Sequence, residues 1–439
     1  EKNRRLIKMY NRRQFFGTVG KPAVAAFAFA VLNPSGIRKV IDTLANYTGT
    51  PEEIARDESF WFSVQQAFTV DRSLINFNNG GVCPSPAIVL EAMKEHWDFA
   101  NKAPSYTMWQ IQEPQKETVR KRLARMFGCD PEEIALTRNA SEGLQICQFG
   151  MDLKAGDEML TTTQDYGRMV TTWKQRVRRE GLVLKQFRIP VPSEDPDEIV
   201  SLFEQNITPK TRVILMCHVI NLTGQILPVK KVVQMARKKG IPVIVDGAHS
   251  FAHFDFKLED LDCDYFASSL HKWLCAPHGT GMLFVRRDRI RDLWPLMAAP
   301  EKMDDDIRKF EEIGTHPAAP YLAIAEAISF HEGIGAKRKE ARLRYLRDRW
   351  VKRLLQYDRF RLHTSLKPEF SCGIANVQIV GIDPAELTKY LWKKYRIIVV
   401  AIKHPEFEGI RVTPNVYTTL EEIDRFCDAM EKVIKCGLK

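Results

Sequence analysis

The sequence lacks the cysteine and histidine patterns that build disulfide frameworks or hold metal ions. Its 9 cysteines occur singly, with no Cys-x-x-Cys pair and no cluster of Cys and His at zinc spacing. Several lie in apolar segments, where a free cysteine behaves as a small hydrophobic residue. We therefore expect neither a disulfide framework nor a metal site.

Long apolar runs, internal repeats and low-complexity segments are also absent. The apolar run from Ala23 to Leu32 is too short to span a bilayer. The chain has 439 residues, of which 44% are apolar and 27% charged, as in a globular protein of two or three domains. Disordered, fibrous and polytopic membrane proteins are excluded.

A net charge of +10 makes nucleic acid or an anionic membrane a conceivable partner, but the charge is concentrated in two segments. Residues 1–30 carry +6 and residues 337–353 carry +7, which leaves −3 for the rest of the chain. In 337–353, Leu343, Leu346 and Trp350 recur at helical spacing, which predicts an amphipathic helix with a buried stripe and a solvated cationic face. This distribution does not predict a nucleic-acid groove.

The first 30 residues have the features of an export leader. Residues 11–16 (Asn-Arg-Arg-Gln-Phe-Phe) resemble a twin-arginine signal, and Ala26-Phe27-Ala28 or Ala28-Phe29-Ala30 offers a small-x-small cleavage site after the apolar run. We expect a twin-arginine leader over residues 1–30 and a periplasmic or otherwise exported protein without a stable membrane anchor. A basic N-terminal helix on a cytoplasmic protein is the alternative.

From about residue 130, short apolar runs alternate with helical patterns, which is typical of a mainly parallel sheet covered by helices. After residue 320 the pattern changes to long helices and then short strands. We predict an α/β protein with an N-terminal helical segment (31–75), a large domain (76–320) and a smaller α+β C-terminal domain (321–439). The predicted strands are 134–137, 157–161, 212–217, 242–245, 264–268 and 281–285 in the large domain, and 373–380, 397–401 and 409–412 in the small one; helices are expected at 141–150, 173–180 and 229–239.

Polar motifs follow four of the predicted strands, at the edge where parallel sheets bind ligands. They are 138–143 (Arg-Asn-Ala-Ser-Glu-Gly), 218–221 (His-Val-Ile-Asn), 246–249 (Asp-Gly-Ala-His) and 269–272 (Ser-Leu-His-Lys). Together they resemble the class V aminotransferase family, fold-type I enzymes that use pyridoxal 5′-phosphate (PLP). The resemblance extends from about Asn76 to Asn415, and it implies a mainly parallel seven-stranded sheet in the large domain.

The resemblance implies catalytic roles for three of these residues. Lys272, in Ser268-Ser-Leu-His-Lys-Trp273, matches the family lysine that forms the Schiff base with PLP. Asp246 matches the carboxylate that pairs with the pyridine nitrogen, which makes the ring an electron sink. His249 stands where cysteine desulfurases carry a glutamine near the phenolic oxygen of PLP, and this form is more similar to the isopenicillin N epimerase branch.

The phosphate of PLP is expected at the start of the helix that follows residue 139, because a helix N-terminus offers free N–H groups. By resemblance, the Ala140 and Ser141 amides and the Ser141 hydroxyl bind it, with side-chain contacts from Ser269 and His271. A plain helix cap is the structural alternative.

The resemblance assigns three further contacts to the cofactor. Asn221 matches a second group near the phenolic oxygen. Either Asp165 or Tyr166 stands where desulfurases stack a histidine on the ring, and Tyr166 is preferred because it has an aromatic face. Thr315 lies in a segment from which a neighbouring subunit contributes to the phosphate site, so a homodimer with composite sites is implied.

An amino-acid-like substrate needs a partner for its carboxylate, and a bidentate arginine is the usual one. Arg411, followed by an Asn/Tyr turn, resembles the family's clamp. Asn79 and Gly80 belong to a loop (76–82) that closes over the substrate in the family. Tyr106, with Trp109, is expected either at the same entrance or in the core.

The choice of reaction depends on a cysteine that this chain lacks. Desulfurases carry a nucleophilic cysteine in the stretch that corresponds to Ile397–Pro405, and here that stretch has none. We therefore expect epimerisation or racemisation, or transamination, at the α-carbon. A β-lyase or desulfurase-like C–S lyase is the alternative, and a non-catalytic binding protein a less favoured one. No second acid or base is apparent from the sequence.

Overall fold

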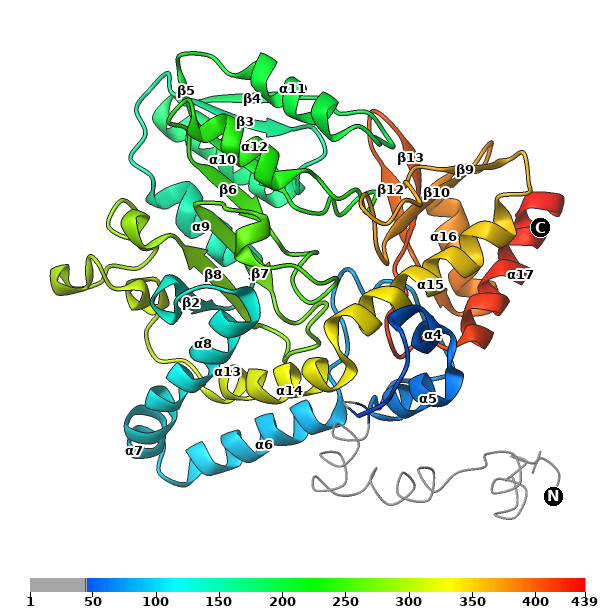
Figure 1. Cartoon of the computed structure of the whole chain (residues 1–439), viewed down its shortest axis with the longest axis horizontal. Coiled ribbons are helices and arrows are strands. Elements are labelled where there is room, and N and C mark those ends of the chain that lie inside the picture. The colour runs from blue at the N-terminus through cyan, green and yellow to red at the C-terminus, as the bar shows by residue number, and fades with distance from the viewer. Residues whose placement is uncertain (1–43, 45, 439) are drawn as a thin grey trace.

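The computed structural model describes residues 44 and 46–438. The predicted leader and part of the N-terminal segment therefore lie outside the described residues. The chain forms two lobes, one around a large twisted sheet and one around a small sheet near the C-terminus (Figure 1). No helix among the described residues is long and apolar enough to cross a membrane.

The large lobe contains a seven-stranded sheet in the order β2-β8-β7-β6-β5-β3-β4. β8 is antiparallel to both of its neighbours and the other pairs are parallel. This confirms the predicted fold class. The strands are β2 (Ile134–Thr137), β3 (Glu158–Thr162), β4 (Val183–Phe187), β5 (Thr211–Cys217), β6 (Val243–Asp246), β7 (Tyr265–Ser269) and β8 (Gly281–Val285).

Helices cover both faces of this sheet, so most of its strands are buried throughout and read as continuous apolar runs. The helices are α6 (Ala87–Lys102), α7 (Pro104–Tyr106), α8 (Glu113–Phe127), α9 (Ala140–Gly150), α10 (Gly167–Glu180), α11 (Pro196–Asn206), α12 (Val229–Arg237), α13 (Ala319–Leu322) and α14 (Ile324–Ile334).

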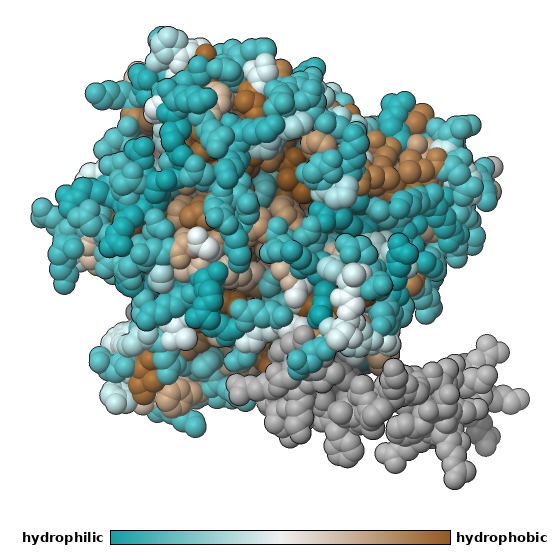
Figure 2. Space-filling view, in the orientation of Figure 1, coloured by the Kyte–Doolittle hydropathy of each residue, from teal (hydrophilic) through white to brown (hydrophobic). Residues whose placement is uncertain are grey.

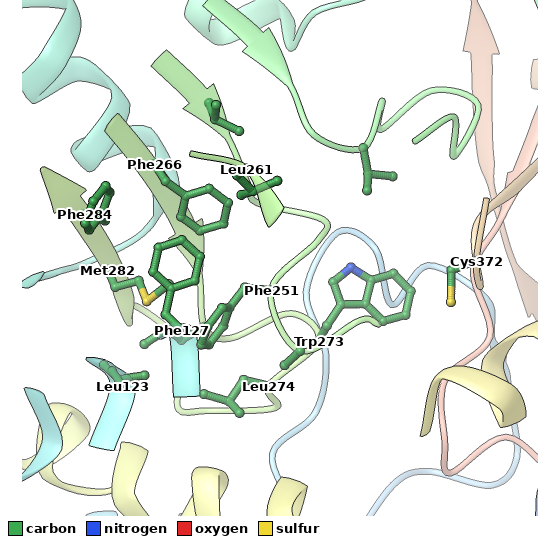
Figure 3. Close-up of a cluster of buried hydrophobic side chains, with 14 of the residues drawn as sticks. Leu123, Phe127, Phe251, Leu261, Phe266, Trp273, Leu274, Met282, Phe284 and Cys372 are labelled. Atoms are coloured by element: carbon green, nitrogen blue, oxygen red, sulfur yellow. The ribbon is translucent and has the colours of Figure 1, made fainter. Parts of the chain in front are cut away.

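An aromatic cluster packs directly beneath the strand ends (Figure 3). The rings of Phe127 and Phe266 lie 4.7 Å apart, and Phe284 and Phe251 pack around them. Gly247 is required here because a Cβ at this position would come within 1.9 Å of the Phe266 ring. The core thus supports the turn that follows Asp246.

The small lobe is a four-stranded antiparallel sheet in the order β12-β13-β10-β9, flanked by helices. A separate parallel pair, β1 with β11, ties the segment before residue 80 to this lobe, and an isolated bridge joins Asn78 to Thr413. The elements are β1 (Ile75–Asn76), β9 (Phe360–Leu362), β10 (Ala375–Ile379), β11 (Ile397–Ile398), β12 (Val400–Lys403), β13 (Glu408–Val412), α4 (Pro51–Arg56), α5 (Glu58–Gln66), α15 (Ala336–Leu354), α16 (Pro384–Tyr395) and α17 (Leu420–Cys436).

α15 is the predicted amphipathic helix, but the expected solvated cationic face is wrong. Lys339, Arg342 and Arg347 are at most 2% exposed. Arg342 donates to the Ala55 carbonyl at 2.9 Å and pairs with Glu58, which fastens α15 to the N-terminal helices. Other basic residues of α15 pair with acids of α17: Arg349 with Asp424, and Arg353 with Asp428 and Glu431. Much of the +7 charge of residues 337–353 is therefore buried or paired with acidic residues of the same chain.

Candidate active site

The strand ends of the large sheet meet around a cavity of about 530 Å³. β6, β7 and the loops after β2 and β3 supply its walls, as expected for the carboxyl edge of a mainly parallel sheet. Seven of the predicted site residues line it: Ala140, Ser141, Tyr166, Asp246, Ser269, His271 and Lys272.

Lys272 lies in the turn after β7, with its Nζ 3.2 Å from Nε2 of His249. Burial, together with the positive charge of Arg411, lowers the pKa of its amine from 10.5 to about 8, although Asp246 opposes this shift. A much larger share of the amine is therefore neutral, and thus nucleophilic, than for an ordinary lysine.

Asp246 ends β6 and is 5% exposed. Its Oδ1 accepts the Ala248 N–H at 2.9 Å, and burial raises the pKa of the carboxyl to about 6. Such a carboxylate is poorly solvated and is stabilised by a cationic N–H partner. This is the property that a partner for a protonated ring nitrogen needs.

His249 is a buried, neutral imidazole, since burial and the charge of Lys272 hold its pKa well below 6.5. Its Nδ1 has no partner among the described residues. Gly80 packs against the ring, because a Cβ there would lie 3.4 Å from Cε1 of His249. The Gly80 N–H donates to Oγ1 of Thr413 at 3.0 Å.

At the start of α9, the free amide is that of Ser141. The Ala140 N–H, which we expected to bind phosphate, donates instead to Oγ of Ser269 at 2.9 Å. Oδ1 of Asn139 accepts the Glu142 N–H at 2.9 Å, whereas the Ser141 N–H has no such partner in the described part of the chain. Ser269, the last residue of β7, thus occupies the Ala140 amide, whereas the phosphate contact of Ser141 stays a prediction.

The hydrogen bonding of His271 leaves one of its ring nitrogens available for an anion. Its Nδ1 is 3.0 Å from the Thr280 carbonyl, so this nitrogen carries the hydrogen and Nε2 is left for the cavity. Burial, with the charge of Lys272, lowers its pKa to about 4. A bound phosphate would favour the protonated, donating form.

Hydrogen bonding distinguishes Asp165 from Tyr166, and it supports the prediction that Tyr166 is the residue that meets the ring. Asp165 is buried, and its carboxylate accepts the N–H and the hydroxyl of Thr162 at 2.8 and 2.6 Å and the Cys217 N–H at 2.9 Å. These bonds fix the turn after β3 and leave no face for a cofactor. Tyr166, the next residue, lines the cavity.

Arg411 on β13 is 7% exposed and is held on two sides. Its Nη1 donates to the Asn221 carbonyl at 3.0 Å and its Nη2 to Oδ1 of Asn78 at 2.9 Å, while Nε is buried and has no partner within residues 46–438. Burial lowers its pKa to about 10, which leaves the guanidinium charged at neutral pH.

Asn78, rather than Asn79, is the asparagine that reaches this arginine. Asn79 is completely buried, donates to the Asn76 and Thr413 carbonyls at 2.9 Å, and accepts the Tyr417 hydroxyl at 2.6 Å. It fastens the loop to the small lobe and has no group left for a substrate. The Asn-Phe-Asn-Asn motif indicated the loop but could not distinguish its asparagines.

Tyr106 and Thr315 do not reach the Lys272 cavity within one chain. Tyr106 is 63% exposed at the end of α7. Thr315 is exposed and lines a separate cavity of about 560 Å³, together with Trp109. Two arginines that we did not single out lie at the mouth of the Lys272 cavity: Arg138, paired with Glu142, and the exposed Arg168.

Residues 75–426 match the family model described as aminotransferase class V. The chain belongs to the class V aminotransferase family. It is 32% identical over 396 residues to the isopenicillin N epimerase of Streptomyces clavuligerus, covering 84% of this chain and 98% of that protein.

Solved structures show the same fold. The apo structure of a cysteine desulfurase from Thermococcus onnurineus NA1 matches with a TM-score of 0.75 at 24% identity, covering 85% of this chain and 98% of that one. A C-DES variant with glycine covalently linked to its PLP cofactor matches with a TM-score of 0.74 at 22% identity, covering 83% and 98%.

The family's cofactor is PLP, and the residues present fit it. The cavity brings together the Lys272 amine, which readily loses its proton, the buried Asp246 carboxylate and the N-terminus of α9. Nδ1 of His249 and Oδ1 of Asn221 are buried and have no partners in the part of the chain that the structure describes, so each has hydrogen-bonding capacity left for a bound polar group. The chain is a PLP-dependent enzyme of this family.

Proposed function

We propose that this enzyme acts at the α-carbon of an amino acid or an amine-bearing small molecule, as an epimerase or racemase, with transamination as the related outcome. The observation that carries this proposal is Lys272 in the turn after β7, whose Nζ lies 3.2 Å from Nε2 of His249 and whose charge interacts with the buried Asp246 and Arg411. The similarity to isopenicillin N epimerase supports the choice of reaction.

Each residue has a definite task in such a reaction. Arg411 binds the substrate carboxylate, with Asn78 and Asn221 fixing the plane of its guanidinium. Lys272, once its amine is free and neutral, removes the α-proton. PLP supplies the covalent link to the substrate amine and takes up the electron pair left at the α-carbon. His249, 3.2 Å from Nζ, orients the lysine amine.

Epimerisation also requires a proton donor on the opposite face, and we assign this role to Tyr166. It comes from the loop after β3, whereas Lys272 comes from the turn after β7, and Asp246 on β6 lies between them in the sheet. Tyr166 is close enough to Arg411 for a negative charge on its oxygen to raise the arginine pKa. A guanidinium nearby stabilises the phenolate that remains after proton transfer.

A β-lyase or a desulfurase-like C–S lyase remains the second candidate, because desulfurases and a persulfide-forming fold relative share the architecture. No cysteine lines the Lys272 cavity in the described part of the chain. Cys217, at the end of β5, is buried, which raises its pKa well above 9.0. A buried thiol of this kind is a poor nucleophile.

We further propose a homodimer in which Thr315 of one chain completes the phosphate site of the other. Within one chain Thr315 lines a cavity separate from that of Lys272. Figure 2 shows exposed hydrophobic residues at the lower left of the molecule, where α6 and α7 lie in Figure 1. The aromatic side chains of Trp97 on α6, Tyr106 on α7 and Trp109 just after α7 are 50 to 63% exposed. Exposed apolar and aromatic surface of this kind supports a protein contact. We separately propose that the protein is exported through the twin-arginine route, and cell fractionation tests this.

The deciding experiment combines a structural and a chemical readout. Borohydride reduction of the purified protein and peptide mass spectrometry should place a phosphopyridoxyl group on the Lys272 peptide. Incubation with single enantiomers of candidate amino acids in deuterated water should then give α-deuterium with inversion. Keto-acid formation would favour transamination, and release of a β-substituent would favour the lyase. No adduct on Lys272 would refute the enzyme proposal itself.

A further inference from the structure

Cys83 and Cys275 are in contact beneath the active site, although 192 residues separate them. Their Sγ atoms lie 3.5 Å apart, and the side chains are 0% and 1% exposed. Oδ1 and Nδ2 of Asn415 complete the local packing from the small lobe, with Nδ2 donating to Sγ of Cys83 at 2.8 Å. Neither cysteine takes part in the reaction proposed above.

The two cysteines belong to the two loops that form the site. Cys83 directly follows the loop 76–82, which we call the substrate loop. The Cys83 N–H donates to the His271 carbonyl at 3.0 Å, and the Cys83 carbonyl lies 3.1 Å from Nε2 of His278. The Cys275 N–H lies 3.2 Å from the Lys272 carbonyl. Cys275 has φ = +60°, a left-handed conformation that a residue with a side chain adopts only when its surroundings hold it there.

A buried cation lies beside the sulfur pair. Lys339 of α15 is 2% exposed and donates to the Trp273 carbonyl. The hydrogen bond from Cys83 and the charge of Lys339 together lower the pKa of Cys275, while burial raises the pKa of Cys83. Cys275 is therefore the thiol that ionises more readily, and the thiolate is the reactive form.

We propose that Cys83 and Cys275 are an oxidisable dithiol, and that peroxides convert it to a disulfide that ties the substrate loop to the turn carrying Lys272. The Cys275 thiolate attacks the peroxide O–O bond and becomes a sulfenic acid, releasing water or an alcohol. The Cys83 thiol then attacks this sulfur, releasing water. Two thiols thus lose two electrons and two protons, and the peroxide is reduced.

The disulfide changes the geometry of the site. Closing a bond of about 2.05 Å from a 3.5 Å contact brings the two sulfur atoms about 1.4 Å closer together, and we expect the two loops to take up part of this displacement. Since Lys272 lies three residues before Cys275, this displacement reaches the amine. A misplacement of about 1 Å costs on the order of 100-fold in turnover. The oxidised enzyme is therefore expected to be about 100-fold slower and to recover with dithiothreitol.

The test treats the PLP-loaded enzyme with hydrogen peroxide, blocks remaining thiols under denaturing conditions, and maps disulfides by peptide mass spectrometry. We expect one linked peptide pair, Cys83 with Cys275, lost on reduction and absent from Cys83→Ser and Cys275→Ser. The matched control is Cys436→Ser, which removes an exposed cysteine and should leave the linked pair unchanged. A linkage between other cysteines, or only unlinked thiols or sulfinic acids at these positions, would overturn the proposal.

The effect on activity rests on the proposed function, whereas the linkage does not. The rate at which borohydride traps PLP on Lys272 after reloading the cofactor-free protein gives a second readout, independent of the reaction catalysed. If the disulfide forms and this rate is unchanged, the disulfide does not control the site. If it forms and slows trapping, but no α-proton exchange is seen with any substrate, the dithiol stands and the proposed function fails.

Discussion

The lowered pKa of Lys272 is open to a direct test. A fall from 10.5 to about 8 corresponds to roughly 3 kcal/mol against the ammonium form. At pH 7 about 9% of the amine is then neutral, compared with about 0.03% for an ordinary lysine, a gain of roughly 300-fold. Since the folded pKa is depressed, the neutral fraction should rise about tenfold per pH unit well below pH 7, reach one half near pH 8 and then level off.

Two substitutions should shift this midpoint in opposite directions. Asp246 raises the pKa of Lys272 and Arg411 lowers it. Asp246→Asn should therefore lower the midpoint, and Arg411→Gln should raise it, each by about one pH unit as expected for charges a few ångströms apart. Burial, the largest cause, is unchanged in both variants.

The assay is competitive labelling of the cofactor-free protein with acetic anhydride across pH, followed by peptide mass spectrometry. Lys352, whose side chain is 68% exposed, serves as the reference amine in the same sample. A Lys272 midpoint near that of Lys352 would refute the burial argument. Shifts of the same sign in the two variants would refute the electrostatic one.

Three further substitutions test other parts of the molecule. Arg342→Ala should cost about 2 to 3 kcal/mol of unfolding free energy in urea, because it leaves the buried Ala55 carbonyl unsatisfied and removes a buried side chain. Lys352→Ala, at an exposed pair, should cost less than about 0.5 kcal/mol. Glu406 accepts a hydrogen bond from Nε2 of Gln164 at 2.9 Å and so links the β12–β13 turn to the loop that carries Tyr166. Glu406→Gln should therefore lower kcat more than it raises KM. The control, Glu408→Gln on the same strand pair, should change neither kcat nor KM. Tyr166→Phe should keep the ring, the bound cofactor and α-deuterium exchange of one enantiomer, but lose inversion; inversion at the wild-type rate would exclude it as the second acid.

The sequence predicted the large sheet well because its strands are short apolar runs bounded by polar turns. β2 and β8 have the predicted bounds, and the polar strand ends meet because parallel strands place their carboxyl ends at one edge. The start of α10 was placed too late, at Trp173 instead of Gly167. Its first turn carries few apolar residues, and no side chain caps it.

What the sequence could not supply were contacts between distant segments. Nothing local in α15 distinguishes Arg342, which is buried against Ala55 and Glu58, from Lys352, which is exposed. Likewise, the Ala140 amide donates to Ser269, the last residue of β7, which lies 129 residues further along the chain. Periodicity reports which face of a helix is apolar, but the partner of a buried cation depends on tertiary packing.

The division of the site between the two lobes has a consequence for specificity. Lys272 and Asp246, proposed to act on the α-proton and to pair with the cofactor ring, lie in the large lobe, after β7 and at the end of β6. The proposed carboxylate clamp belongs to the small lobe, since Arg411 lies on β13 and its partner Asn78 follows β1, which pairs with β11. A substrate that bridges Lys272 and Arg411 therefore also bridges the lobes. Changes in the small lobe that spare Arg411 should therefore alter which substrates are accepted, through KM, while leaving unchanged the pKa of Lys272, which burial in the large lobe and the charge of Arg411 lower.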